Sequence, residues 1–459
     1  MKPTATPRSL GSEPIPRLLA RYAVPAIIAT VSTSLYNIID SIFIGRGVGP
    51  LALSALALAM PLMNILSAFG SMVGIGAAAL LSIRLGRDDR AGAERTLGNA
   101  VVLHLSVGAA LTLLGLLGLD PILRAFGASD GTIGYARDFM RIILGGTVVN
   151  QLFLGLNELL RASGHPRRAM AVMLVTVVLN CLLCPLFLFG FGWGVRGAAL
   201  ATVLAQSAAL MLTVAHFAAR VSFPRFRSGI FRIDRRIAGG ILAIGLAPFL
   251  LHLCASAVVV AVNCALRATG GDEAIGAYGI VYRVAMLFLM VVTGLNRGMQ
   301  PVVGYNYGAG RFDRMLGALG RTALCAVCVT SVGFLIAELL PRQAALLFVD
   351  AADGAAAERM IALAAEGLRL ALAAFPAVGF QIVASNFFQY IGKPRQSIFL
   401  SLTRQLLFLI PLLWLLPPRL GTQGVWLAMC SADAAASLLA GALLWRQVAR
   451  MRRMQERRA

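Results

Sequence analysis

Long apolar runs separated by short polar segments make up almost the entire chain. A helix needs roughly 20 mostly apolar residues to cross the hydrocarbon core of a bilayer. The 459 residues are 58% hydrophobic and 13% charged, and a soluble core could not bury so much apolar surface. The sequence therefore predicts an all-α integral membrane protein with twelve transmembrane helices. The runs lie at about 20–45, 52–82, 97–119, 138–160, 169–191, 195–219, 238–265, 274–303, 317–340, 366–390, 397–417 and 423–446.

The basic residues stand in clusters between these runs, and the formal net charge is +21. A chain this basic can bind nucleic acid, but these arginines do not gather on one solvated face, so we expect no nucleic-acid partner. An excess of Lys and Arg marks the cytoplasmic loops of membrane proteins. The larger clusters therefore predict a multi-pass protein of the cytoplasmic (inner) membrane, with both termini and the loop 220–237 in the cytoplasm.

The second half of the chain repeats the first in five short motifs. Pro25 corresponds to Pro248, Gly86-Arg87 to Gly310-Arg311, and "GHPR" at 164–167 to "GKPR" at 392–395. The other two matches are "ALSA" at 52–55 with "AIGA" at 274–277, and "GVRG" at 194–197 with "GTQG" at 421–424. Five collinear matches predict two six-helix lobes of the same orientation, a parallel repeat about an axis along the membrane normal, which is typical of alternating-access transporters.

The repeat and the charge clusters together predict the limits of these parts. We expect a cytoplasmic tail at 1–17, lobes at 18–219 and 238–446, a cytoplasmic linker at 220–237 and a basic tail at 447–459.

Several segments in both halves are similar to one known family. They include "YNIIDSIFIGRGVGPLALSALALAMPL" at 36–62, "NELLRASGHPRRAM" at 157–170, "FGFGWGVRGAALATVLAQ" at 189–206 and "GMQPVVGYNYGAGRFDRM" at 298–315, with a further long match at 375–417. Together they resemble the multidrug and toxic compound extrusion family, especially its bacterial MepA-like branch. The resemblance implies a 6+6 fold with two lobes around a central cavity, and export of small amphipathic, mostly cationic compounds driven by a proton or sodium gradient.

Sequence signatures of an enzyme or an ATP-driven pump are absent. The two lysines, Lys2 and Lys393, do not lie in a phosphate-binding loop, and no H-E-x-x-H motif occurs. Two C-x-x-C pairs, Cys181/Cys184 and Cys325/Cys328, lie in apolar runs without histidine or a turn, so we expect small apolar residues there and no metal site. We therefore expect a carrier without a cofactor, in which H+ or Na+ is the coupling ion.

A carrier of this kind needs an ion-binding group within the membrane, and Asp40 is the best candidate. Thr30, Thr33, Asn37 and Asp40 are spaced by 3, 4 and 3 residues and form one polar stripe on a helix. A carboxylate there can bind a proton or donate oxygen to sodium, and Asp40 also falls where the family has its coupling aspartate. The alternative is a structural acid that forms hydrogen bonds between helices.

The fifth run departs from the family pattern. The family motif resembles "N-x-x-x-D-P", whereas this chain has Asn180 followed by Cys184 at the position of the acid. One ion ligand of the usual set is therefore missing. Thr202 in the sixth run matches a polar family position and can add an oxygen, which makes Asp40, Asn37, Asn180 and Thr202 the predicted ion-coupling residues.

Other polar residues within the runs are candidates for the substrate cavity. For each of them, a hydrogen bond between helices is the structural alternative. Arg297 stands where many relatives have glutamine, and it either reaches the membrane interface or lines the cavity. Asp433, the repeat equivalent of Gln206, is a possible second titrating group or a packing acid. The cavity candidates are Tyr36, Thr33, Asn157, His252, Ser256, Asn296, Gln300, Gln381, Ser385 and Arg297.

Two functions compete for this chain. The first is a multidrug or metabolite antiporter, which would work as a monomer on small-molecule substrates in the lipid bilayer. The second is a flippase for lipid-linked precursors, from a related fold class. Twelve spans argue against the flippase, because those chains resemble fourteen-helix proteins, while the extra arginines argue mildly for it. The internal repeat and the missing catalytic signatures disfavour a channel or an intramembrane enzyme.

Overall fold

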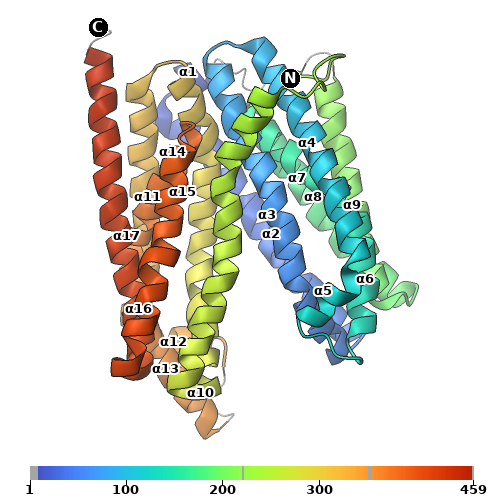
Figure 1. Ribbon diagram of the computed structural model, residues 1–459, viewed down its shortest axis with the longest axis vertical. Helices are drawn as coiled ribbons and strands as arrows, with labels where there is room; N and C mark the ends of the chain where they lie inside the picture. The colour runs from blue at the N-terminus through green and yellow to red at the C-terminus, as the bar shows by residue number, and fades with distance from the viewer. Residues whose placement is uncertain (1–8, 220–221, 350–353, 457–459) are drawn as a thin grey trace. The chain divides into compact units, whose positions relative to one another are not determined.

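The computed structural model describes residues 9–219, 222–349 and 354–456. The side chains of residues 37, 46, 50, 53 and 454–456 also lie outside what it describes. Within these ranges the regular structure is entirely helical (Figure 1). The elements are α1 (Ser9–Ser12), α2 (Ile15–Gly47), α3 (Pro50–Gly86), α4 (Arg90–Leu117), α5 (Leu119–Ala125), α6 (Ile133–Gly145), α7 (Thr147–Ala162), α8 (Pro166–Pro185), the π-helix η1 (Leu186–Gly190), α9 (Gly194–Ala218), α10 (Arg235–Gly308), α11 (Phe312–Leu339), α12 (Pro341–Leu346), α13 (Ala355–Ala371), α14 (Phe375–Tyr390), α15 (Pro394–Leu402), the π-helix η3 (Thr403–Leu409), α16 (Ile410–Leu415) and α17 (Pro417–Glu456).

The helices account for the twelve predicted spans. Nine helices in the described ranges are long and apolar enough to cross a membrane, and two bent pairs, α6 with α7 and α13 with α14, bring the number to eleven. The 74 residues of α10 would form a helix of about 110 Å, far longer than a bilayer is thick. Helix α10 breaks at Gly271, where φ is 66° and ψ is −156°, so it crosses twice. The prediction of twelve transmembrane helices is confirmed.

The chain divides into two compact units. The first contains residues 1–13, 24–252 and 300–310, and the second contains residues 14–23, 253–299 and 311–459. Each unit therefore takes most of its helices from one half of the sequence and a short segment from the other half. The lobe limits of 18–219 and 238–446 stay a prediction.

The repeated sequence motifs mark turns with the same backbone geometry in each unit. Gly164 of "GHPR" and Gly392 of "GKPR" have φ of 102° and 70°, and a proline follows at the first position of α8 and of α15. Glycine adopts positive φ without a steric penalty, and proline at the first helical position needs no hydrogen-bond partner. Gly194 and Gly421, from the last pair of motifs, also have positive φ, of 55° and 60°. The repeated motifs therefore form turns of the same kind, each leading into a helix, in both halves of the chain.

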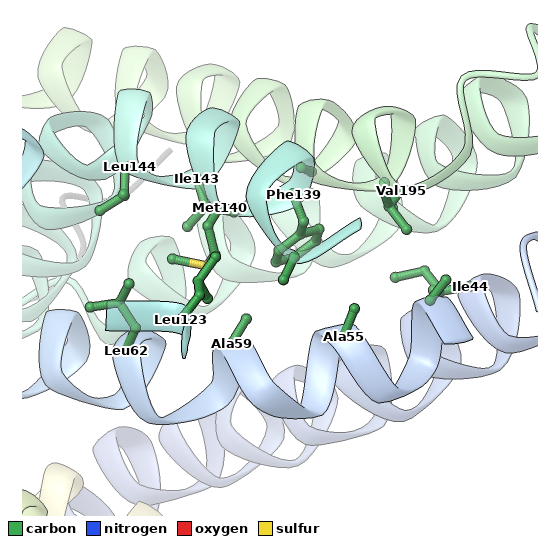
Figure 2. Packing of buried hydrophobic residues seen from close by; sticks show 14 of the residues in the cluster. Ile44, Ala55, Ala59, Leu62, Leu123, Phe139, Met140, Ile143, Leu144 and Val195 are labelled. Atoms are coloured by element: carbon green, nitrogen blue, oxygen red, sulfur yellow. The ribbon is translucent and has the colours of Figure 1, made fainter. Parts of the chain in front are cut away.

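Large side chains from the short helices fill the core of the first unit near the predicted extracellular ends of its helices. Leu123 of α5 and the α6 residues Phe139 and Met140 point toward Ala55 and Ala59 of α3 (Figure 2). All five side chains are almost completely buried. Large residues opposite alanines pack densely because the small residues leave room for them. The bent pair α6–α7 thus covers α3 with its amphipathic first helix.

Glycines let α3 approach the N-terminal part of α10 within the first unit. A Cβ atom on Gly245 would lie 1.7 Å from the carbonyl oxygen of Met72, and one on Gly76 would lie 2.1 Å from that of Ile241. Such distances are far below van der Waals contact, so only glycine allows the two backbones to come this close. Small residues at the interface commonly permit close helix packing in membranes.

The connection between α9 and α10 is fixed to the first unit. Asn99 of α4 donates from Nδ2 to the carbonyl oxygen of Arg232 at 3.2 Å, and its Oδ1 accepts from the backbone N–H of Asp234 at 2.8 Å. The Asp234 side chain then caps α10 by accepting from the N–H groups of Arg236 and Ile237. The predicted linker at 220–237 is therefore held against α4 at Arg232 and Asp234.

The close approach of α3 and α10 makes Gly245 sensitive to any added side chain. We expect Gly245→Ala to destabilise the protein by about 1–3 kcal/mol, because a methyl group forces the helices apart. Gly239→Ala is the matched control in the same helix, since an added Cβ meets no described atom within 4 Å there. Thermal unfolding in detergent should show a lower Tm for Gly245→Ala than for Gly239→Ala. Equal Tm values would contradict the proposed contact.

Candidate functional site

Asp40 meets Cys184 in the first unit. Asp40 lies in α2 and is half-buried, whereas the Cys184 side chain in α8 is fully buried. The Cys184 Sγ donates a hydrogen bond to Asp40 Oδ1 at 3.0 Å. The side chain at the position of the missing family acid thus still contacts the carboxylate, but as a neutral donor.

Asn180 and Thr202 connect the same face of α8 to α9. Asn180 precedes Cys184 by four residues and therefore lies one helical turn away on the same face. Its Nδ2 donates to Thr202 Oγ1 at 3.0 Å, and the Thr202 hydroxyl donates to the carbonyl oxygen of Ala198 at 3.2 Å. Asn180 is 2% exposed and Thr202 is 8% exposed. Buried polar groups of this kind need such partners, because an unpaired group in the membrane costs several kcal/mol.

Tyr36 joins this cluster from α2, one turn before Asp40. Its phenol hydroxyl shares a hydrogen bond with the Thr202 side chain and lies within electrostatic range of Asp40. Three helices, α2, α8 and α9, therefore bring Tyr36, Asp40, Asn180, Cys184 and Thr202 together. Of the predicted ion-coupling residues, Asn37 lies in α2, but its side chain is outside what the structure describes.

The chemistry of this cluster follows from its donor set. One carboxylate can change its charge, while the amide, the two hydroxyls and the thiol stay neutral over the ordinary pH range. A carboxylate with neutral donors around it can bind a proton or accept a small cation. Cys181 is half-buried on the neighbouring turn, and the described residues contain no group of three or more metal-binding side chains.

The other predicted cavity residues of the first unit lie elsewhere. The Thr33 hydroxyl donates to the carbonyl oxygen of Ala29 in its own helix at 2.8 Å. Asn157 of α7 is buried and donates to the carbonyl oxygen of Ala169 in α8 at 3.0 Å, which is a bond between helices. Gln300 donates to the carbonyl oxygen of Ile75 at 3.4 Å, and His252 is exposed.

In the second unit, the polar candidates have various surroundings. The Ser385 hydroxyl lies 2.8 Å from that of Ser401, which joins α14 to α15. Asn296 donates to Val292 in its own helix at 2.9 Å, and Arg297 is half-buried within electrostatic range of Tyr390. Gln381 is buried and Ser256 is exposed. The role of these residues in substrate binding stays a prediction.

Two ion pairs lie within the helices, and one of them involves Asp433. Glu158 and Arg161 of α7, three residues apart, form the other pair, and both are largely buried. Arg404 Nε lies 2.6 Å from Asp433 Oδ1 in the second unit, so Asp433 has a cationic partner. The sequence does not predict the Arg404–Asp433 pair. The two residues are 29 positions apart on different helices, so their contact depends on how these helices pack.

Comparison with known proteins relates this arrangement to one family. The MatE family model matches residues 25–186 and 248–415, which cover both halves of the chain. The multidrug export protein MepA of Staphylococcus aureus (strain N315) is 24% identical over 434 residues, which are 93% of each chain. MepA of Staphylococcus haemolyticus (strain JCSC1435) is 25% identical over 432 residues, or 92% of each. The crystal structure of MATE in the bent conformation superposes with a TM-score of 0.91 at 24% identity, over 98% of this chain and 99% of that one.

The hydrogen bond between Asn180 and Thr202 predicts energetic coupling between these residues. In a double-mutant cycle of Asn180→Ala and Thr202→Val, the loss of unfolding free energy should be non-additive by about 1 kcal/mol. Thr213→Val on the same helix is the control partner, because the buried Thr213 hydroxyl bonds to Ala209 within α9. Unfolding by denaturant in detergent micelles measures both cycles. Additive losses in the Asn180/Thr202 cycle would show that the two side chains do not interact.

Proposed function

Because this chain belongs to the MatE family, we propose that it is a secondary active exporter of small amphipathic, mostly cationic compounds. In this function an ion gradient drives alternating access of one substrate cavity. The single observation that carries the proposal is the half-buried Asp40 carboxylate in the hydrogen-bonded cluster of α2, α8 and α9. A charged group inside a membrane helix is costly and is therefore usually kept for function.

The class of substrate follows from the relatives. Two relatives that align with more than nine-tenths of this chain are named multidrug export proteins. Transfer of their substrate class to this chain favours dyes, quaternary ammonium compounds and other amphipathic cations over a single metabolite. A flippase for lipid-linked precursors is not favoured.

The membrane context completes the proposal. The chain is a multi-pass membrane protein, and we place it in the bacterial cytoplasmic membrane with both termini on the cytoplasmic side. The arginine clusters between the spans support this orientation. Each lobe contains its own polar groups, so we infer that one chain is the functional unit.

The contact between Cys184 and Asp40 favours the proton as the coupling ion. Sodium is a hard cation, and hard cations prefer several oxygen ligands such as carboxylates, carbonyls and water. The sulfur of Cys184 is a soft ligand, and the neutral thiol occupies one side of Asp40 Oδ1. A proton needs only one oxygen of the carboxylate, so the replacement of an acid by Cys184 weakens a sodium site much more than a proton site.

Coupling requires that the bound ion and the substrate favour different conformations of the protein. Deprotonated Asp40 accepts the hydrogen bond of Cys184 and attracts a cationic substrate. Protonated Asp40 is neutral, so the attraction for the cation is lost and the substrate can leave. The Tyr36 hydroxyl lies within electrostatic range of Asp40 and is a neutral neighbour for either form, while Thr202 bonds to Asn180 and holds α8 to α9.

The proposal predicts that Asp40→Asn abolishes gradient-driven export. Asparagine keeps the shape and the hydrogen-bonding capacity of the side chain but cannot change its charge. Export of a fluorescent cationic dye from proteoliposomes should fall to the level of empty vesicles, while Tm stays at the wild-type value. Asp120→Asn is the control, because Asp120 pairs with Arg137 outside the cluster. Wild-type export by Asp40→Asn with an unchanged response to pH would place coupling at another residue.

The coupling ion can be tested at position 184. Cys184→Asp provides a second carboxylate beside Asp40, so we expect export to gain a clear dependence on sodium. Cys184→Ser is the matched control, because serine keeps a neutral hydrogen-bond donor and should keep the ion preference of the wild type. The measurement is dye export from proteoliposomes with a proton gradient or a sodium gradient imposed separately. Export by the wild type that is driven by the sodium gradient would contradict proton coupling.

A further inference from the structure

A line of polar residues occupies one face of α7, away from the Asp40 cluster. Gln151, Gly155, Glu158 and Arg161 are spaced by 4, 3 and 3 residues, so they lie on the same face of the helix. Gln151 and Arg161 are 3% and 4% exposed, and Glu158 is largely buried. Ten residues of helix span about 15 Å, so this face runs from the interior of the lobe to the end of α7.

His104 fills the one position on this face that lacks a side chain. A Cβ atom on Gly155 would lie 1.9 Å from His104 Nε2, so the imidazole of α4 lies directly against the Gly155 backbone. Gly155 is between Gln151 and Glu158 along α7. His104 therefore supplies a titratable ring at the level between the amide and the carboxylate.

Glycines of α3 lie against the same residues of α7. A Cβ atom on Gly70 would lie 2.8 Å from Gln151 Oε1, and one on Gly74 would lie 3.2 Å from the Cα of Gly155 and 3.7 Å from the Cγ of Glu158. Helices α3, α4 and α7 contact one another in pairs, and Figure 1 shows them side by side in the first unit. We call the polar residues that the three helices bring to this face the α7 ladder: Gln151, His104, Glu158 and Arg161.

The buried His104 ring has few polar partners among the described residues. Its side chain is completely buried, and neither ring nitrogen makes a hydrogen bond of good geometry within the described residues. The Gln151 amide is its polar neighbour, but Gln151 Nε2 donates to the carbonyl oxygen of Leu66 at 2.8 Å. A buried polar group without a partner costs about 1–3 kcal/mol, so its presence needs another explanation than stability.

The charged groups that surround His104 come from α7. Glu158 and Arg161 form an ion pair at the cytoplasmic end of the ladder, as the predicted topology places it. Helix α3 presents Gly70 and Gly74 to this region. Helix α6 also contacts α4; its Arg141 is exposed, and its other two charged side chains have partners elsewhere. Arg137 bonds to Asp120 and Asp138 to Arg196.

We propose that the α7 ladder is a proton path between the interior of the first unit and the cytoplasm, in which His104 is the relay residue. The inference rests on the proposed proton-driven export. One ring nitrogen of the neutral imidazole binds a proton and the other releases one, so the ring returns to its neutral form without any other reactant. Glu158 exchanges the proton with the cytoplasm, and Arg161 balances its charge when it is ionised.

The first test compares transport modes in proteoliposomes. His104→Gln should slow dye export driven by a proton gradient by at least about tenfold, because a positioned proton-transfer group commonly contributes that much or more. Exchange of labelled for unlabelled dye at equal pH needs no net proton movement and should stay within about twofold of the wild type. His216→Gln is the matched control. The His216 Nδ1 lies 2.7 Å from Arg168 Nη1, and the residue is not part of the ladder.

Two outcomes of this test would overturn the proposal. If driven export and dye exchange fall together in His104→Gln, His104 serves only the packing of the lobe. If both rates stay at the wild-type level, the path runs elsewhere. If the wild-type protein shows no gradient-driven export, the proposed function is contradicted instead. A second measurement, which does not depend on transport, then still tests the proton path.

The second measurement follows exchange of the His104 ring protons with water by nuclear magnetic resonance, on protein with isotope-labelled histidine in lipid nanodiscs. The ladder predicts fast exchange in the wild type and exchange slowed by about tenfold or more in Glu158→Gln, which cannot pass a proton. A slow exchange in the wild type that Glu158→Gln leaves unchanged would overturn the proposal, whatever the transport assays show.

Discussion

The absence of water in the hydrocarbon core is the constraint on which the rest of this structure depends. Every backbone polar group must find its partner inside the protein, so the membrane-spanning part of the described chain consists of helices. The same constraint makes each polar side chain within a span expensive. Several of them lie in small polar groups: the cluster around Asp40, the pair Arg404–Asp433 and the ladder on α7.

Close helix packing is the second consequence of this constraint. Lipid tails are as apolar as leucine, so helices gain little by burying apolar surface against each other and associate through packing and hydrogen bonds. Glycines at 76 and 245 bring two backbones together, and Gly155 makes room for an imidazole. Glycine therefore has two uses here, as a contact surface for a neighbouring backbone and as a space for a functional side chain.

The sequence predicted the fold well because the dominant signal is local. Each apolar run predicts one transmembrane span. Turn motifs such as "GHPR" and "GKPR" predict a backbone geometry that depends only on neighbouring residues. The contacts of the candidate site were harder to predict. Asp40 stood out as a charge in an apolar run, but its contact with Cys184 depends on how α2 packs against α8. His104 gave no signal of its own, because its place opposite Gly155 exists only after α4 and α7 have packed.

The two lobes share a fold but differ in the charge of corresponding helices. In the first unit, the pair α8 and α9 carries neutral groups, Asn180 and Thr202, beside a carboxylate that forms no ion pair with an arginine among the residues that the structure describes. In the second unit, the corresponding helices carry Arg404 and Asp433, which neutralise each other at 2.6 Å. An arginine beside a carboxylate favours its charged form, and Asp40 has no such partner among the described residues. For this reason we place the proposed coupling at Asp40 of the first lobe rather than at Asp433 of the second.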